Sequence, residues 1–224
     1  FRLEVDEPFW LLSVASVEEV GPPDRGLLGR HALWDESALR LPQVDSQDEA
    51  GDFRIVVRHR GVLTTIHYPH HPLDVVGWKG DLTAFALNVD QLRPVGSYNY
   101  HVPPSAHTTF QLGSHAVLCT FVPRPLETAD DVLKVPFFHR NIDYDEVLFY
   151  HRGDFFSRAG IQPGNLTWHP QGIHHGPQPQ AVARAGTKDF TDEVAVMLDT
   201  RHPLTLTEAA SGLEMRDYWR SWQG

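Results

Sequence analysis

Short runs in which apolar and polar residues alternate occur along most of the chain and predict strands rather than helices. Most of these runs are rich in Val, Ile or Phe and end at Gly, Pro, Asp or Asn. The candidate strands are Arg54–His59, Val62–His67, Ala116–Val122, Glu146–His151, Leu166–His169 and Glu193–Leu198. Before the C-terminal region no stretch of about a dozen residues has helical periodicity. We therefore expect an all-β fold.

One helix is expected, near the C-terminus. Thr205 and Glu208 have the spacing of a capping box, in which two side chains satisfy free N–H groups of the first helical turn. Apolar residues with helical spacing accompany this signal and predict a short helix from Leu206 to about Met215. Two segments rich in Pro, Gly, Asp and Ser, Gly21–Arg30 and Leu41–Gly51, are predicted to be loops.

The chain has 224 residues, enough for a substantial core, and its 17 Gly and 17 Pro indicate many turns. Short strands joined by such turns are typical of sandwiches and jelly-roll barrels. Phe1 is not Met and the residues after it already alternate like a strand, so we expect a longer protein. We predict that residues 1–50 are the tail of an N-terminal β region with connecting loops. Residues 51–200 are predicted to form the barrel, and residues 201–224 a C-terminal helical segment.

Charge and cysteine content narrow the possible partners. The chain has 29 acidic and 19 basic side chains, a net charge of −10, and no Lys or Arg stripe that would bind phosphates. No run approaches the ~18 apolar residues of a membrane-spanning helix. We therefore expect neither a nucleic-acid partner nor a membrane partner. The single cysteine, Cys119, excludes an internal disulfide and a Cys-x-x-Cys zinc site, and fits a reducing compartment such as the cytoplasm.

Histidine is over-represented, with 14 residues, and five of them lie between positions 139 and 175. Because histidine is the commonest metal ligand in proteins, this cluster is the first candidate site. Two spacings are present in it. The first is His139-Arg-Asn-Ile-Asp-Tyr-Asp-Glu146, followed after six residues by Gly153. The second is Gly164, five residues, and then a Pro-x-Gly-x-x-His sequence that ends at His175.

Together these spacings resemble the two signature motifs of the cupin superfamily, with Asn141 in place of the second histidine of the first motif. The resemblance implies a cupin jelly-roll barrel, also called a double-stranded β-helix. Alternate residues of such a barrel point inward, so ligands on two hairpins can converge on one metal. The remaining set, His139, Glu146 and His175, would hold a divalent metal on one face and leave other positions open. That arrangement is associated with non-haem Fe(II) oxygenases.

Two neighbouring residues compete with this ligand set. Asp145 lies beside Glu146 and His174 lies beside His175, and strand alternation points only one residue of each pair inward. The spacing of the two motifs favours Glu146 and His175.

Three segments resemble the homogentisate 1,2-dioxygenase family within that superfamily. They are Pro136-Phe-Phe-His-Arg-Asn141, Val75-Val-Gly-Trp-Lys-Gly80 and the interval from His169 through His175 to Pro177. Their order corresponds to the C-terminal part of the family's protein. The resemblance implies an Fe(II) enzyme that uses O2 to open the aromatic ring of a dihydroxyphenylacetate-like small molecule. The implied reaction converts homogentisate to maleylacetoacetate in tyrosine and phenylalanine catabolism, and the implied assembly is a trimer-based homo-oligomer.

The resemblance also implies roles around the metal. His101 aligns with the general base near the substrate hydroxyl, and His107, six residues further on, is an alternative base. His169 matches a histidine that contacts substrate or oxygen, and His175 shares that side of the site. The family has a substrate-holding tyrosine where this chain has Phe155, which leaves Tyr150 as the candidate for substrate binding.

Two other functions stay open. A metal-dependent sugar isomerase or epimerase of the cupin superfamily would contain zinc and need no O2, but Asn141 removes one of its ligands without an evident replacement. A non-enzymatic cupin would use the barrel as a binding or storage module. Such a module would keep its function after His139 and His175 were replaced.

Overall fold

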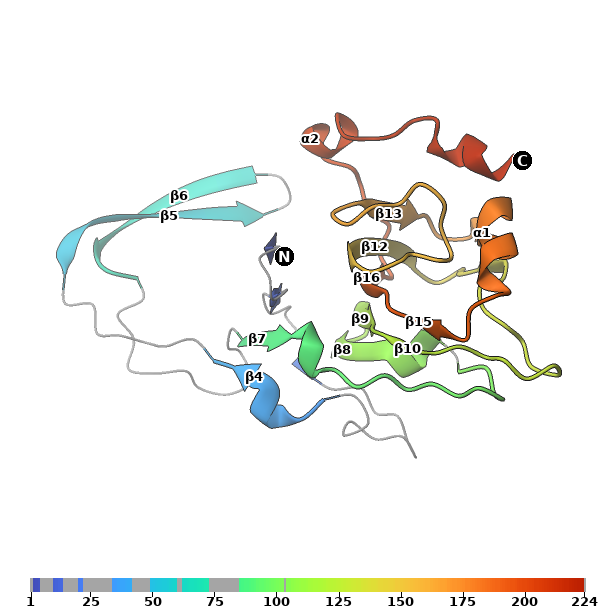
Figure 1. Cartoon of the computed structure of the whole chain (residues 1–224). Coiled ribbons are helices and arrows are strands. Elements are labelled where there is room, and N and C mark those ends of the chain that lie inside the picture. The colour runs from blue at the N-terminus through green and yellow to red at the C-terminus, as the bar shows by residue number, and fades with distance from the viewer. Residues whose placement is uncertain are drawn as a thin grey trace.

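The computed structural model describes residues 2–4, 10–13, 20–21, 34–41, 49–59, 62–72, 85–102 and 104–223. This described part is mostly β-strand with two short α-helices, which confirms the all-β prediction (Figure 1). No helix in it is long and apolar enough to cross a membrane.

The strands are β1 (Arg2–Glu4), β2 (Trp10–Ser13), β3 (Val20–Gly21), β4 (Leu39–Arg40), β5 (Ala50–His59), β6 (Val62–His70), β7 (Phe85–Asn88), β8 (Thr108–Leu112), β9 (Ala116–Phe121), β10 (Arg124–Pro125), β11 (His139–Arg140), β12 (Asp145–Arg152), β13 (Leu166–His169), β14 (His174–His175), β15 (Phe190–Thr191) and β16 (Val194–Thr200). The α-helices are α1 (Pro179–Ala185) and α2 (Glu208–Ser211), and the 3-10 turns are η2 (Glu36–Ala38), η3 (Val89–Gln91), η4 (Pro104–His107) and η5 (Tyr218–Trp222).

All six candidate strands are present, as β5, β6, β9, β12, β13 and β16. Four of them belong to a six-stranded antiparallel sheet with the order β13-β12-β16-β9-β8-β3. Strand β12 lies between β13 and β16, so Glu146 is opposite His169 on one side and opposite Asp199 on the other. The register of this sheet therefore places three polar side chains in one row.

The two faces of the sheet have different surroundings, because successive side chains of a strand point to opposite faces. On one face, residues of β8, β9, β12 and β16 pack into a core with Trp34 and residues near β7. That core contains Trp34, Leu87, Val89, Leu92, Phe110, Leu118, Val122, Phe149, Val194 and Val196. On the other face, alternate residues of β12 and β16 line a cavity. They are Glu146, Leu148, Tyr150, Ala195, Met197 and Asp199.

Smaller sheets complete the described part. Strand β7 belongs to a four-stranded sheet of order β1-β2-β7-β4, and β10 pairs with β15. Strands β11 and β14 form a two-residue pair, and β5 and β6 pair with each other alone among the described strands (Figure 1). The domain boundaries at residues 50 and 200 stay predictions. The Val75–Gly80 segment and most of the two loops expected at Gly21–Arg30 and Leu41–Gly51 lie outside the described residues.

Turns with positive φ explain the glycine at the end of the first motif and the glycine inside the second motif. Gly153 has φ +92°, and a Cβ there would lie 2.4 Å from the carbonyl oxygen of Asp192. Gly172 has φ +79° and its N–H donates to the carbonyl of Asn141 at 2.7 Å. Only glycine adopts these conformations without strain. The second bond joins the Pro-x-Gly turn to the first motif, so the two motifs meet in space.

The C-terminal helix is present but shorter than expected. Helix α2 begins at Glu208, and its N-cap is Thr207, whose side chain accepts a hydrogen bond from the N–H of Ala210. Thr205 is therefore not the cap. After α2 the chain returns to the loop that follows β14, where Trp222 Nε1 donates to the carbonyl of Gly176 at 2.9 Å. The C-terminal turn thus supports the backbone directly beside His175.

Candidate metal centre

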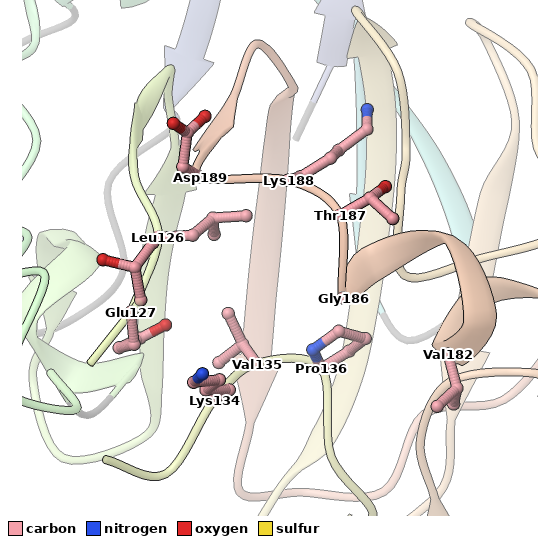
Figure 2. Close-up of a pocket in the computed structure, with 11 residues that line it drawn as sticks. Leu126, Glu127, Lys134, Val135, Pro136, Val182, Gly186, Thr187, Lys188 and Asp189 are labelled. Atoms are coloured by element: carbon pink, nitrogen blue, oxygen red, sulfur yellow. The ribbon is translucent and has the colours of Figure 1, made fainter. Parts of the chain in front are cut away.

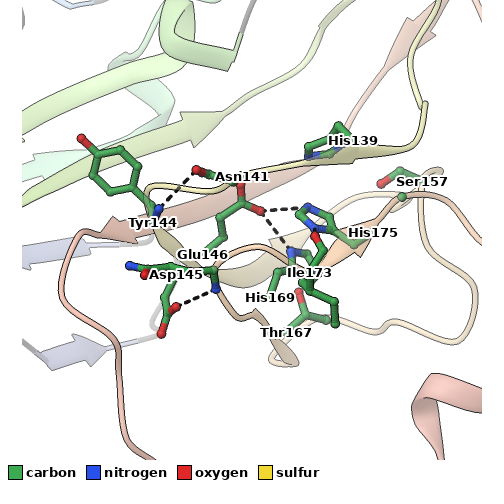
Figure 3. A network of polar contacts seen from close by, with 12 residues as sticks. His139, Asn141, Tyr144, Asp145, Glu146, Ser157, Thr167, His169, Ile173 and His175 are labelled. Atoms are coloured by element: carbon green, nitrogen blue, oxygen red, sulfur yellow. Dashed lines mark hydrogen bonds and ion pairs between the residues drawn. The ribbon is translucent and has the colours of Figure 1, made fainter.

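Three ligand atoms converge from three strands at one end of the sheet. His139 on β11, Glu146 on β12 and His175 on β14 each offer one donor atom, and these atoms lie within 4.8 Å of one another (Figure 3). His139 is opposite His175 in the β11–β14 pair, with ring centroids 4.3 Å apart. The alternation and motif spacing that favoured these residues therefore bring them together. Two imidazoles and one carboxylate suit a divalent transition metal.

Backbone contacts set the tautomers of both imidazoles. His139 Nδ1 lies 3.3 Å from the carbonyl of Phe137, and His175 Nδ1 lies 3.1 Å from the carbonyl of Ile173. A carbonyl only accepts, so each Nδ1 carries the proton and each Nε2 keeps a free lone pair. Burial lowers the pKa of His139 below 6.5, which favours the neutral form that a metal ligand needs.

The Nε2 atom of His175 supports a metal at this point. It is buried without a hydrogen-bond partner, although Glu146 Oε2 is only 3.0 Å away. Two atoms that bind the same metal ion lie close together without a hydrogen bond between them, because the lone pair of each points at the ion. The Nε2 atom of His175 and the Oε2 atom of Glu146 have this relationship. The three residues therefore fit a bound metal.

The carboxylate of Glu146 is held on both oxygens. Oε1 accepts a hydrogen bond from Asn141 Nδ2 at 2.9 Å, and Oε2 accepts one from His169 Nδ1 at 3.2 Å. Burial alone would raise the pKa of Glu146. The hydrogen bonds from His169 and Asn141 outweigh burial and hold that pKa well below its usual range. Asn141, which replaces a ligand of the cupin motif, thus orients the remaining carboxylate.

The competing neighbours lie elsewhere. Asp145 accepts hydrogen bonds from the N–H groups of Gln171 and Leu204, both at 2.8 Å, and from the indole of Trp168. These bonds tie the end of β12 to two loops. His174 is exposed, and its ring contacts Phe138. Neither residue points toward the ligand atoms.

Next to the ligand cluster lies a cavity of about 440 Å³. A cavity of this size suits a small aromatic molecule. The other residues predicted for the substrate side all line it: His101, His107, His169 and Tyr150. His169 stacks on His175 with centroids 4.2 Å apart, and burial lowers the pKa of His169 below 6.5. Ligands and substrate-side residues therefore share one space.

The two candidate bases differ in their partners. His101 Nδ1 lies 3.2 Å from Glu127 Oε1, and the ring of His101 contacts Phe137. A carboxylate on Nδ1 directs the proton to that nitrogen and leaves Nε2 as the basic atom. His107 is buried and its ring packs against Phe121, with centroids 5.1 Å apart. The carboxylate on Nδ1 supports His101 as a base, and His107 lines the same cavity as the alternative.

Tyr150 lines the cavity but its hydroxyl has a partner already. The hydroxyl lies 3.0 Å from Thr167 Oγ1, and its ring packs edge-on against Phe155. Burial raises the pKa of Tyr150, so the hydroxyl stays protonated. Phe155, where the family resemblance led us to expect a tyrosine, is 4% exposed and belongs to a buried cluster.

Three charged residues of the cavity wall were not predicted from the sequence. Arg158 is 8% exposed, Glu127 orients His101, and Asp199 lies opposite Glu146. Burial, followed by the charge of Glu146, raises the pKa of Asp199 to about 7. None belongs to a spacing motif, because the folding of distant segments brings each to the cavity.

A second cavity of about 410 Å³ adjoins the first and shares Leu126, Glu127, Val135 and Pro136 with it (Figure 2). Lys134, Lys188, Thr187 and Asp189 give it a polar rim. Lys188 pairs with Asp154. The ligand triad does not line this second cavity. It therefore borders the candidate site without belonging to the metal centre.

Comparison with known proteins places these features in a family. Residues 97–224 match the family described as homogentisate 1,2-dioxygenase C-terminal, and residues 13–89 match homogentisate 1,2-dioxygenase N-terminal. The N-terminal match reaches further along the chain than the tail expected at residues 1–50. A protein of Saccharolobus solfataricus named as a dioxygenase is 38% identical over 199 residues, which are 88% of this chain and 51% of that protein.

Two relatives carry a more specific name. The homogentisate 1,2-dioxygenase of Rhizobium leguminosarum is 28% identical over 215 residues, and that of Rhodopseudomonas palustris is 28% identical over 216 residues. Each match covers 90% of this chain and 48% of the relative. The chain therefore spans about half the length of the curated relatives it matches.

Proposed function

Because this chain belongs to the homogentisate 1,2-dioxygenase family, we propose that it carries the active site of an Fe(II)-dependent ring-cleaving dioxygenase. The observation that carries this proposal is the convergence of His139, Glu146 and His175 beside a cavity that also contains His101. The proposed substrate is homogentisate or a similar dihydroxyphenylacetate, and the proposed product is maleylacetoacetate. This reaction belongs to tyrosine and phenylalanine catabolism.

The residues around the proposed iron are arranged to hold it with open positions. Bound Fe(II) would supply coordination sites at which an aromatic substrate and O2 meet. Asn141 and His169 each hold one oxygen of Glu146, so the carboxylate stays fixed. The carbonyls that accept from His139 and His175 fix the two imidazoles in the same way. The chain therefore preorganises the ligand set.

We propose that His101 removes the proton of a substrate hydroxyl. Its Nε2 takes the proton, while Glu127 accepts from Nδ1–H and stabilises the resulting imidazolium. His169, kept neutral by burial, is proposed to contact substrate or oxygen through its free Nε2.

Oxygen consumption and metal content test this function together. The protein is purified without oxygen, its metals are measured, and O2 uptake is followed on homogentisate. We expect iron and uptake that depends on homogentisate. Zinc with no O2 requirement would support a sugar isomerase or epimerase. Absence of both iron and uptake would contradict the dioxygenase, and retention of binding function by His139→Ala and His175→Ala would support a non-enzymatic cupin.

The oligomeric state and the cellular location of the protein are proposed on the basis of the family resemblance. We propose a trimer-based homo-oligomer in the cytoplasm, with the aromatic acid and O2 as the small-molecule partners. The single buried Cys119 fits a reducing compartment. Analytical ultracentrifugation of the purified protein tests the assembly.

A further inference from the structure

Three arginines line the cavity beside the metal centre, and only one of them is a buried cation without an acidic partner. Arg124 pairs with Glu193 at 3.1 Å, and Arg140 is exposed to solvent. Arg158 is 8% exposed, and among the described residues no carboxylate lies within ion-pair distance of it. The carboxylate of Glu193 is close enough to act on Arg158 through its charge, but it forms its ion pair with Arg124. A buried cation without an ion pair of its own is unfavourable, and an anion in the cavity would stabilise it.

The hydrogen bonds of Arg158 leave part of its guanidinium unused. Nη1 donates to the carbonyls of Ser157 and Gly176, both at 3.1 Å, whereas Nε is buried without a partner. Because Gly176 follows His175 in the chain, the hydrogen bond to the carbonyl of Gly176 holds the cation close to the ligand cluster.

The loop after β12 is built to hold this arginine in place. Gly153 turns the chain, and Phe155 and Phe156 are 4% and 3% exposed in two separate apolar clusters. The N–H of Arg158 then donates to the carbonyl of Phe155 at 3.0 Å. Phe155 therefore anchors the turn instead of offering a hydroxyl to the cavity.

From this geometry we propose that Arg158 binds the carboxylate of the substrate and selects aromatic acids over neutral aromatic compounds. This inference rests on the proposed function, since it names the group that recognises the acid of that substrate. The planar guanidinium suits a carboxylate because it can donate two parallel hydrogen bonds. Tyr150 is left with a structural role toward Thr167.

Binding to the metal-free protein tests the proposal without relying on turnover. The dissociation constants of 2,5-dihydroxyphenylacetate and 2,5-dihydroxyphenylacetamide are measured by calorimetry without oxygen. We expect the wild type to prefer the acid by about 10- to 100-fold. Arg158→Gln should reduce this ratio to near 1 by weakening acid binding alone, and Arg158→Lys should keep most of it. The matched control, Arg152→Gln, should keep the full ratio because Arg152 pairs with Asp90 outside the cavity.

Each result bears on the proposal separately from catalysis. Equal affinities in the wild type, or no binding of either compound, overturn it. A folded Arg158→Gln protein with the wild-type ratio also overturns it, as does a folded Arg158→Lys protein without any preference. If acid preference depends on Arg158 while no O2 is consumed on homogentisate, the inference stands and the dioxygenase proposal fails.

Discussion

His139 and His175 face each other in a strand pair only two residues long, and this contact brings together two of the three candidate ligands. The pair is tight because Gly176 follows it: a Cβ on Gly176 would lie 2.8 Å from Cα of Phe138. The His-Gly-Pro sequence therefore has a packing role. It lets β14 approach β11 closely enough for two imidazoles to meet.

Replacement of ligands and of their supports should affect metal affinity to different extents. We expect His175→Ala to weaken metal binding more than about 100-fold, and Asn141→Ala by about 10- to 100-fold because it frees one oxygen of Glu146. His174→Ala, one residue away but exposed, should bind metal like the wild type. Metal titration of the metal-free proteins measures these affinities. Equal losses in the two histidine variants would refute the assignment.

The choice of base can be decided with two histidine variants. His101→Asn should lower kcat by about 10²- to 10⁴-fold with an unchanged metal content, because the proton acceptor is lost. Glu127→Gln should have a smaller effect of the same kind. His107→Asn should change kcat by only a few-fold. Steady-state O2 uptake gives kcat, and a large loss in His107→Asn alone would reverse the assignment.

The raised pKa of Asp199 predicts a specific pH dependence of stability. Its folded pKa of about 7 lies above the ordinary 3.8, so the folded state binds this proton more tightly than the unfolded state. The contribution to stability is therefore present at acidic pH and is lost as the pH rises from about 4 to 7. Relative to Asp199→Asn, the metal-free wild type should lose up to about 4 kcal/mol of unfolding free energy across this window.

Urea denaturation at several pH values measures this effect. The exposed Asp130 provides the control, since Asp130→Asn should follow the wild-type profile. Profiles of Asp199→Asn and wild type that stay parallel between pH 4 and 7 would count against a buried, protonated Asp199.

The two motif glycines should differ in tolerance. Gly153→Ala combines a positive φ with a Cβ 2.4 Å from a backbone oxygen, so we expect a loss of about 3 kcal/mol or more of unfolding free energy. Gly172→Ala has a similar φ but open space around the Cβ, and should cost about 1 to 2 kcal/mol. Urea denaturation of the two variants compares them. Similar losses at both positions would show that steric contact at Asp192 is unimportant.

The ligand positions could be predicted because they depend on local rules. Strand alternation points only one residue of each neighbouring pair inward. The spacing from Glu146 to Gly153 and the Pro-x-Gly-x-x-His spacing then select Glu146 over Asp145 and His175 over His174. Arg158 and Glu127 could not be found in this way. They reach the cavity through loop anchoring and through pairing of distant segments, which no short spacing encodes.

The same distinction holds for the secondary structure. The long apolar strands were predictable from alternation, whereas the two-residue strands β11 and β14 depend on tertiary pairing. Helix α1 is seven residues long, and its N-cap, Gln178, makes no capping bond. Pro179 in its first turn is a start signal, but proline is equally common in the turns of this chain, so the helix was not predicted. The N-cap of α2 is Thr207, two residues after the predicted Thr205, because both positions carry a threonine that can cap a helix.

The contact between Trp222 and Gly176 gives the molecule an optical reporter. The indole N–H donates a hydrogen bond to the carbonyl of Gly176, the residue that follows the candidate ligand His175. Indole emission is quenched by nearby paramagnetic ions and shifts with changes in its hydrogen bonding. Loading of the centre can therefore be followed in real time as the emission difference between the wild type and Trp222→Phe.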